Sequence, residues 1–171
     1  MDATEAARRE AERIHQAAVA EGDDPWNLLE LVRREAARRD LDVYALAQGD
    51  SALKGGRAVL DSQAGCILYE DIGSAFDRAF LIAHELGHFV LEGGTEDVVT
   101  GEVQPGRSAE DAPVGVERVL DYGARERREV RMDLFARELL LPRSAARHHH
   151  LDSGCSSADI ATRLGAPLEV V

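Results

Sequence analysis

One pentapeptide in the sequence combines residue types and spacing that can do chemistry: His84-Glu85-Leu86-Gly87-His88. Four residues along an α-helix make slightly more than one turn, a rise of about 6 Å. The imidazoles of His84 and His88 would therefore project from one face, at a separation that a single Zn²⁺ can bridge. Glu85, rotated by about 100° from His84, would lie beside the ion and take a proton from the water that the ion activates. The spacing predicts a zinc hydrolase with Glu85 as its catalytic general base.

The segment 75–91 around this pattern is expected to form a buried helix. Ser74 and Asp77 have the spacing of a capping box, and Gly93 ends the apolar periodicity. The neighbours of the pattern are apolar: Phe80, Leu81, Ile82, Leu86, Phe89 and Val90. Polar side chains inside such a helix need partners, and a metal ion is one. The alternative is a chance match, in which two histidines only make hydrogen bonds in the core. The capped, apolar helix favours the metal site.

A zinc ion held by two imidazoles needs a third protein ligand. A later segment rich in Arg and Glu predicts a helix over 125–141, ended by Pro142. Its acidic residues are the candidate ligands: Glu126, Glu129, Asp133 and Glu138. Glu129 adjoins the apolar side of this helix, which makes it a candidate metal ligand. By spacing alone, an exposed Glu129 paired with Arg125 or Arg131 fits equally well.

Together the two segments, "FDRAFLIAHELGHFVLEGG" and "EVRMDLFARELLLP", resemble the ImmA/IrrE family of metallo-endopeptidases. That family has an apolar helix carrying HELGH and then a helix reading E-x-x-A-N-x-F-A-x-x-L-L-x-P. The likeness covers residues 5–145 and implies that Glu129 is the third zinc ligand. It also implies a protein substrate, often a helix-turn-helix DNA-binding repressor that is cleaved in a stress or mobile-element response.

The chain departs from the family pattern at two places. Met132 and Asp133 stand where Ala-Asn is usual. Asp133, one turn from Glu129, is a candidate acceptor for the N–H of a ligand histidine, although an ordinary surface role fits it as well. The Gly-, Pro- and Thr-rich stretch 93–115 also makes the connection between the two segments longer than in the family, which bears on substrate access.

A peptidase of this kind also needs a donor for the tetrahedral oxyanion. Tyr122, just before the ligand helix, is one candidate, and His148 in the run His148-His149-His150 is another. Consecutive helical residues point in different directions, so these three histidines cannot share one ion; a solvent-facing run is their alternative. Two imidazoles and a carboxylate suit Zn²⁺, but also Mn²⁺ or Fe²⁺.

The helices and short strands expected around these residues indicate a fold of the α+β class. We expect a mostly helical, zincin-like minimal metallopeptidase with a small, largely antiparallel three-stranded sheet packed on the HELGH helix. The further expected elements are helices over 2–21 and 24–39, strands over 41–46, 57–61 and 65–70, and a loop over 93–115. A metallopeptidase domain is expected over 1–145. Residues 146–171 would form a helical appendage, the start of a helix-turn-helix or of a truncated further domain.

The net charge and the cysteine content limit which binding partners and which cellular compartment we expect. The net charge is −12, from 32 acidic against 20 basic residues. Because duplex binding depends on neutralising phosphates, we expect no direct nucleic-acid binding, and no attachment to membranes. The N-terminus lacks an apolar run, and the two cysteines do not form a CxxC pair. These features predict a cytoplasmic protein.

Endopeptidase is the preferred function, and two alternatives remain open. The first is a metal-bound protein-interaction or regulatory module, at the N-terminus of a larger protein and without proteolysis. The second is a non-peptidase metal hydrolase that acts on a small amide. A peptidase differs from the second by needing an extended groove and an edge strand that aligns the peptide.

Overall fold

Helices and one small sheet form the architecture of the computed structural model, which describes residues 2–107 and 120–171, with side chains from Gly123 onward in the second range. The α-helices are α1 (Ala3–Ala20), α2 (Leu28–Ala37), α3 (Ala75–Glu92), α4 (Leu120–Leu140), α5 (Arg143–Leu151) and α6 (Ser157–Leu164). The strands are β1 (Asp42–Leu46), β2 (Ala58–Asp61), β3 (Cys66–Glu70) and β4 (Val98–Thr100). The described residues also include the 3-10 helices η1 (Ser51–Leu53) and η4 (Leu168–Val170). The expected α+β class is confirmed.

The sheet has one strand more than the three that the sequence predicts. Its order is β1-β3-β2-β4. β1 runs parallel to β3, whereas β2 is antiparallel to both β3 and β4. The extra strand, β4, lies inside the stretch 93–115 that was expected to be a loop. Three residues are too few to show a strand period, and β4 forms by pairing with a distant partner. It occupies one edge of the sheet.

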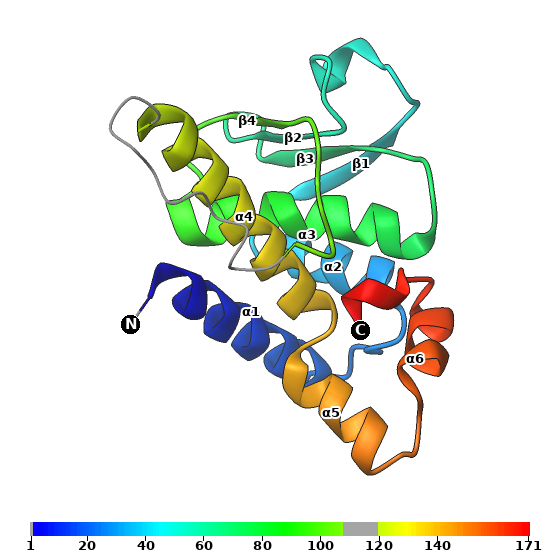
Figure 1. Ribbon diagram of the computed structural model, residues 1–171. Coiled ribbons are helices and arrows are strands. Elements are labelled where there is room, and N and C mark those ends of the chain that lie inside the picture. The colour runs from blue at the N-terminus through cyan, green and yellow to red at the C-terminus, as the bar shows by residue number, and fades with distance from the viewer. Residues whose placement is uncertain (1, 108–119) are drawn as a thin grey trace.

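Helix α3 is the central element of the molecule. Figure 1 shows it beneath the sheet, with α4 crossing it and α1 on the side away from the sheet. It packs against β2 and β3 on one side and against α2 and α4 on the other, while α1 packs on α4. Phe76, Phe80 and Phe135 are among the largest fully buried side chains. Burial of these apolar surfaces stabilises the arrangement.

The ends of α3 match the sequence prediction. Both hydrogen bonds of the capping box between Ser74 and Asp77 are present. At the other end, Gly93 has a φ of +84°, the left-handed conformation that favours glycine at a helix terminus. The HELGH pattern therefore lies within a helix whose two ends are fixed by local sequence.

Gly87 permits the close approach of α4 to α3. A Cβ atom at this position would lie 3.0 Å from Cδ1 of Phe135 and 3.1 Å from Sδ of Met132. Both distances are tighter than ordinary van der Waals contact, so the glycine lets α4 approach more closely than a larger residue would. This approach brings the middle of α4 alongside the two histidines.

Two helices begin several residues away from their expected first residues. Helix α2 begins at Leu28 with Asn27 as its N-cap, rather than at 24. Before it, the Asp24 carboxylate accepts a hydrogen bond of 2.9 Å from the backbone N–H of Trp26, which forms a turn instead. Helix α4 begins at Leu120 rather than at 125.

The C-terminal elements pack on the same core as the central helices. Ile160, Leu164 and Val170 belong to the buried cluster that contains Phe76 and Leu139. The division of the chain at residue 145 stays a prediction. In the described part of the chain, no helix has the length and apolarity needed to cross a bilayer.

Candidate metal centre

The structure brings His84, His88 and Glu129 together between α3 and α4. One potential ligand atom from each residue lies within 4.8 Å of the other two. Nε2 of His84 is 3.3 Å from Oε2 of Glu129, and Nε2 of His88 is 4.0 Å from Oε1. Both histidines are almost completely buried, whereas Glu129 is partly exposed. The geometry expected from the sequence is therefore present, and the role of each residue as a ligand stays a prediction.

Each imidazole is oriented by a carboxylate on its other nitrogen. Nδ1 of His84 is 2.9 Å from Oδ1 of Asp133, and Nδ1 of His88 is 2.9 Å from Oε2 of Glu92. A carboxylate accepts a hydrogen bond, so Nδ1 carries the proton in both rings and Nε2 points toward Glu129. Asp133 thus makes the histidine contact that the sequence suggested for it.

The donor set fits a divalent ion. Nε2 of His88 is buried and has no hydrogen-bond partner among the described residues. A buried nitrogen of this kind is costly unless something else occupies its lone pair. With a second imidazole and a carboxylate nearby, the set matches the ligands of catalytic zinc sites and also suits Mn²⁺ or Fe²⁺.

The two imidazoles have pKa values shifted in opposite directions. Burial lowers the pKa of His84, but its hydrogen bonds to Asp133 and Glu129 raise it more, to about 9. The pKa of His88 is lowered to about 4, first by burial and then by the charge of His84. His88 is therefore neutral near pH 7, whereas a metal ion must compete with a proton for His84.

Glu85 is not part of this ligand set, but its carboxyl group lies close enough to His84 and Glu129 to feel the charge of both. Its carboxyl group is fully buried, and neither oxygen has a hydrogen-bond partner within the described residues. Burial raises its pKa to about 7, against the lowering effect of the His84 charge. A carboxyl group with a pKa near neutrality can both accept and return a proton at working pH.

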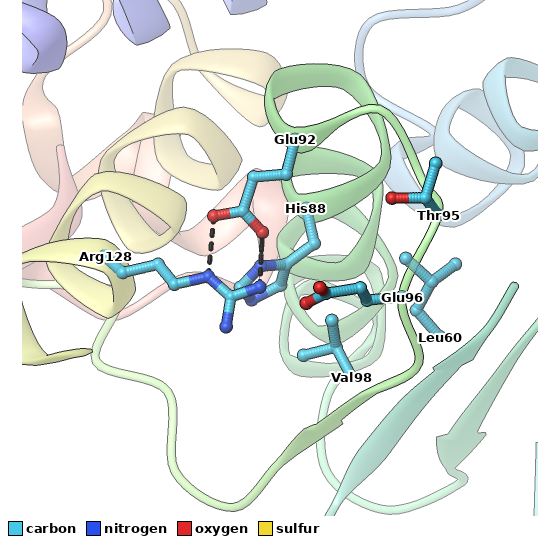
Figure 2. Close-up of a pocket in the computed structure, with 7 residues that line it drawn as sticks. All are labelled: Leu60, His88, Glu92, Thr95, Glu96, Val98 and Arg128. Carbon is cyan, nitrogen blue, oxygen red and sulfur yellow. Dashed lines mark hydrogen bonds and ion pairs between the residues drawn. The ribbon is translucent and has the colours of Figure 1, made fainter.

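The structure also contains an ion pair between Glu92 and Arg128, which the sequence did not predict. Glu92 accepts two hydrogen bonds from Arg128, of 2.6 Å from Nε and 2.5 Å from Nη2 (Figure 2). It accepts a third, of 3.2 Å, from Nη2 of Arg131. Burial raises the pKa of Glu92, but Arg128 and His88 lower it more, to about 2. The position of Glu92, one turn after His88, is a local signal that could have identified it.

Pockets flank the candidate ligands on both sides of β4. One, of about 310 Å³, lies beside His88 and is drawn in Figure 2. Its lining residues are Leu60, His88, Glu92, Thr95, Glu96, Val98 and Arg128. The other, of about 260 Å³, lies beside Glu129. Its lining residues are Val99, Gly101, Glu102, Arg107, Arg125, Glu126 and Glu129.

Of the two oxyanion candidates, His148 lies away from these ligands. His148 lies on α5, in a groove that it shares with His15 and Val19 of α1, and its Nδ1 is 2.6 Å from Oδ2 of Asp152. The chain turns away from the site where α4 ends, before Pro142, so α5 is directed toward α1. The side chain of Tyr122 lies outside the described residues.

Comparisons of the chain with protein-family models, with curated proteins and with solved structures found no match. The resemblance to the ImmA/IrrE family thus stays a prediction from the motif.

Proposed function

We propose that this protein is a zinc-dependent endopeptidase of the ImmA/IrrE type, with His84, His88 and Glu129 as metal ligands and Glu85 as general base. One observation carries the proposal: two Nε2 atoms from α3 and a carboxylate from α4 converge within 4.8 Å. A buried acid without a hydrogen-bond partner among the described residues lies next to them. This combination is typical of metal-assisted hydrolysis.

The residues of the chain supply the proton transfers of such a reaction. When bound, zinc would act as a Lewis acid that lowers the pKa of a water molecule and polarises the scissile carbonyl. Glu85 takes the proton of that water and returns it to the leaving amine. Its raised pKa, about 7, supports both transfers in the same pH range.

The sheet supports a peptide substrate rather than a small amide. Among the described strands, β4 pairs with β2 alone, so it forms an edge of the sheet. An extended peptide can add to such an edge through main-chain hydrogen bonds. Val99, on this strand, is 39% exposed and lines the pocket beside Glu129. A peptide aligned there would pass the candidate metal centre.

The resemblance extends the proposal to substrate and compartment. The candidate substrate is a protein, a helix-turn-helix DNA-binding repressor, which the chain would cleave without binding nucleic acid itself. Cys66 and Cys155 are both free thiols in the structure. Unpaired cysteines are consistent with the reducing cytoplasm that we propose as the location.

The test combines metal analysis with cleavage assays on the purified chain, prepared without added metal. We expect wild type to contain about one zinc ion and to cleave an unfolded protein or a peptide library. Glu85→Gln should retain the metal and lose cleavage, whereas His88→Ala should lose both. Equal cleavage by wild type and Glu85→Gln would refute the catalytic assignment. Metal binding without cleavage of any peptide would favour the interaction module instead.

A further inference from the structure

The carboxylate that orients His84 is itself held by the chain that follows β4. Asp133 is 2% exposed. Its Oδ1 faces His84, and its Oδ2 accepts a hydrogen bond of 3.2 Å from the backbone N–H of Gln104. Nε of Arg107 is 3.4 Å from the same Oδ2. Both oxygens of this buried carboxylate are therefore engaged, one by the metal centre and one by residues 101–107.

Residues 101–107, which we call the strap, run beside α4 after leaving β4 (Figure 1). Nη1 of Arg107 is 3.2 Å from Oε1 of Glu126, and the backbone oxygen of Arg107 accepts a hydrogen bond of 3.0 Å from Arg137. Only 9% of the Arg107 side chain is exposed. The strap is thus fixed on α4 at several points, and Arg107 is its main attachment.

The attachments of Arg107 lie on both sides of the candidate ligand. Glu126 precedes Glu129 by one turn of α4, and Asp133 follows it by one turn. Arg107 therefore spans Glu129 along α4 and ion-pairs with the acidic residues on either side of it. A similar arrangement exists at His88, where Arg128 holds the carboxylate of Glu92 against the imidazole.

We propose that Arg107 is a positioning residue for the metal centre, which acts on His84 through Asp133. The inference rests on the metal centre of the proposed function, but it does not require proteolysis. A buried carboxylate needs a compensating charge and fixed hydrogen-bond donors to keep one orientation. Without Arg107, Asp133 holds the imidazole of His84 less firmly. Loss of a carboxylate that orients a ligand histidine typically costs about 10–100-fold in metal affinity, and loss of Arg107 should cost part of that factor.

The experiment is a double-mutant cycle on zinc affinity in the full chain. It compares wild type, Arg107→Gln, Asp133→Asn and the double variant, with zinc titrated in competition with a chelating dye. Exposed Arg147 on α5 provides the matched control, Arg147→Gln. Far-UV circular dichroism of each variant, in chelator, shows whether it is folded. Absorption spectra of the Co²⁺-loaded forms report the ligand geometry independently of any activity.

We expect Asp133→Asn to weaken zinc binding by about 10–100-fold. Arg107→Gln should weaken it by a smaller factor, up to about 10-fold, and should change the Co²⁺ spectrum, with Arg147→Gln close to wild type. In the Asp133→Asn background, Arg107→Gln should have little further effect, because the residue through which it acts is already altered. Arg107→Lys, which keeps the charge, should restore part of the affinity.

Two results would overturn the inference. One is an Arg107→Gln variant with unchanged zinc affinity and an unchanged Co²⁺ spectrum. The other is an equal loss of zinc affinity on Arg107→Gln in the wild-type and the Asp133→Asn chains, which would mean that Arg107 does not act through Asp133. Failure of the peptidase proposal gives a different result: zinc binding and the cycle behave as expected, but wild type cleaves nothing.

Discussion

The carboxylate of Asp133 lies 2.9 Å from Nδ1 of His84, 49 residues earlier in the chain. This contact joins the two helices that carry the candidate ligands. It also determines which nitrogen of His84 faces Glu129, because the proton stays on the nitrogen that donates to the carboxylate. The orientation of one metal ligand is therefore determined by the packing of α4 on α3.

Gly87→Ala should weaken that packing. The added Cβ would meet Phe135 and Met132 at 3.0 and 3.1 Å, so α4 must shift away from α3. We expect the free energy of unfolding, measured by urea titration in chelator, to fall by about 1–3 kcal/mol. Zinc affinity should fall as well, since Glu129 moves with α4.

Gly123→Ala, within α4, is the matched control. Among the described residues, its new Cβ would meet Nη1 of Arg127 alone, at 3.5 Å, which is ordinary contact. Alanine is the better helix former by about 1 kcal/mol, so this variant should be as stable as wild type or more stable. If the two alanine variants were equally stable, the close approach at Gly87 would not limit the packing.

Zinc binding should release a proton near neutral pH. The pKa of His84 is raised to about 9, so in the absence of metal its Nε2 carries a proton at pH 7 that a metal ion must displace. Apparent zinc affinity should therefore rise as pH increases toward 9 and level off above it. Calorimetric titrations in buffers of different ionisation enthalpy count the released protons.

The variant Glu85→Gln shows whether the released proton comes from His84 or from Glu85. Its proton release should match that of wild type, because the displaced proton comes from His84. Heats that do not depend on the buffer would contradict the prediction. A release that disappears in Glu85→Gln would assign the proton to Glu85 instead.

His15 should make stability sensitive to acid. It is buried where α1 packs on α4, and its Nδ1 is 2.8 Å from the backbone oxygen of Leu139. Burial lowers its pKa below the ordinary value of 6.5. Between the lowered value and 6.5 the unfolded chain binds more protons than the folded chain. The free energy of unfolding therefore falls as pH decreases through this window, by at most about 1.4 kcal/mol per pH unit.

The test compares unfolding of wild type, His15→Gln and His150→Gln between pH 7 and pH 5. Glutamine can still donate to Leu139 but does not titrate, so the pH dependence should become shallower in His15→Gln. His150 is exposed, and its variant should keep the slope of wild type. An unchanged slope in His15→Gln would show that another group is responsible.

Local sequence predicted the parts of the site that lie within one helix. The spacing of His84 and His88 and the capping box at Ser74 depend only on the period and ends of α3, and both are present. Glu129 required the motif resemblance as well, because spacing alone fitted an ion pair with Arg131 equally well. In the structure Arg131 contacts Glu92 instead.

The remaining features depend on contacts between distant segments. β4 is too short to show a period, and its pairing with β2 joins residues about forty positions apart. Arg107 belongs to no motif, and its acidic partners, Glu126 and Asp133, lie 19 and 26 positions further along the chain. His148 was a plausible donor by residue type, but the direction of α5 after Pro142 places it against α1. Such relationships arise from tertiary packing rather than from local pattern.

Because the candidate ligands come from two helices that are separate in the sequence, a bound ion would also act as a cross-link. The unfolded chain offers no such set, so each ion that binds shifts the folding equilibrium toward the native state. At a free zinc concentration one hundred times the dissociation constant, this shift amounts to about 2.7 kcal/mol. The lifetime of the protein against cellular degradation would then follow the local supply of zinc, quite apart from any reaction that the protein performs.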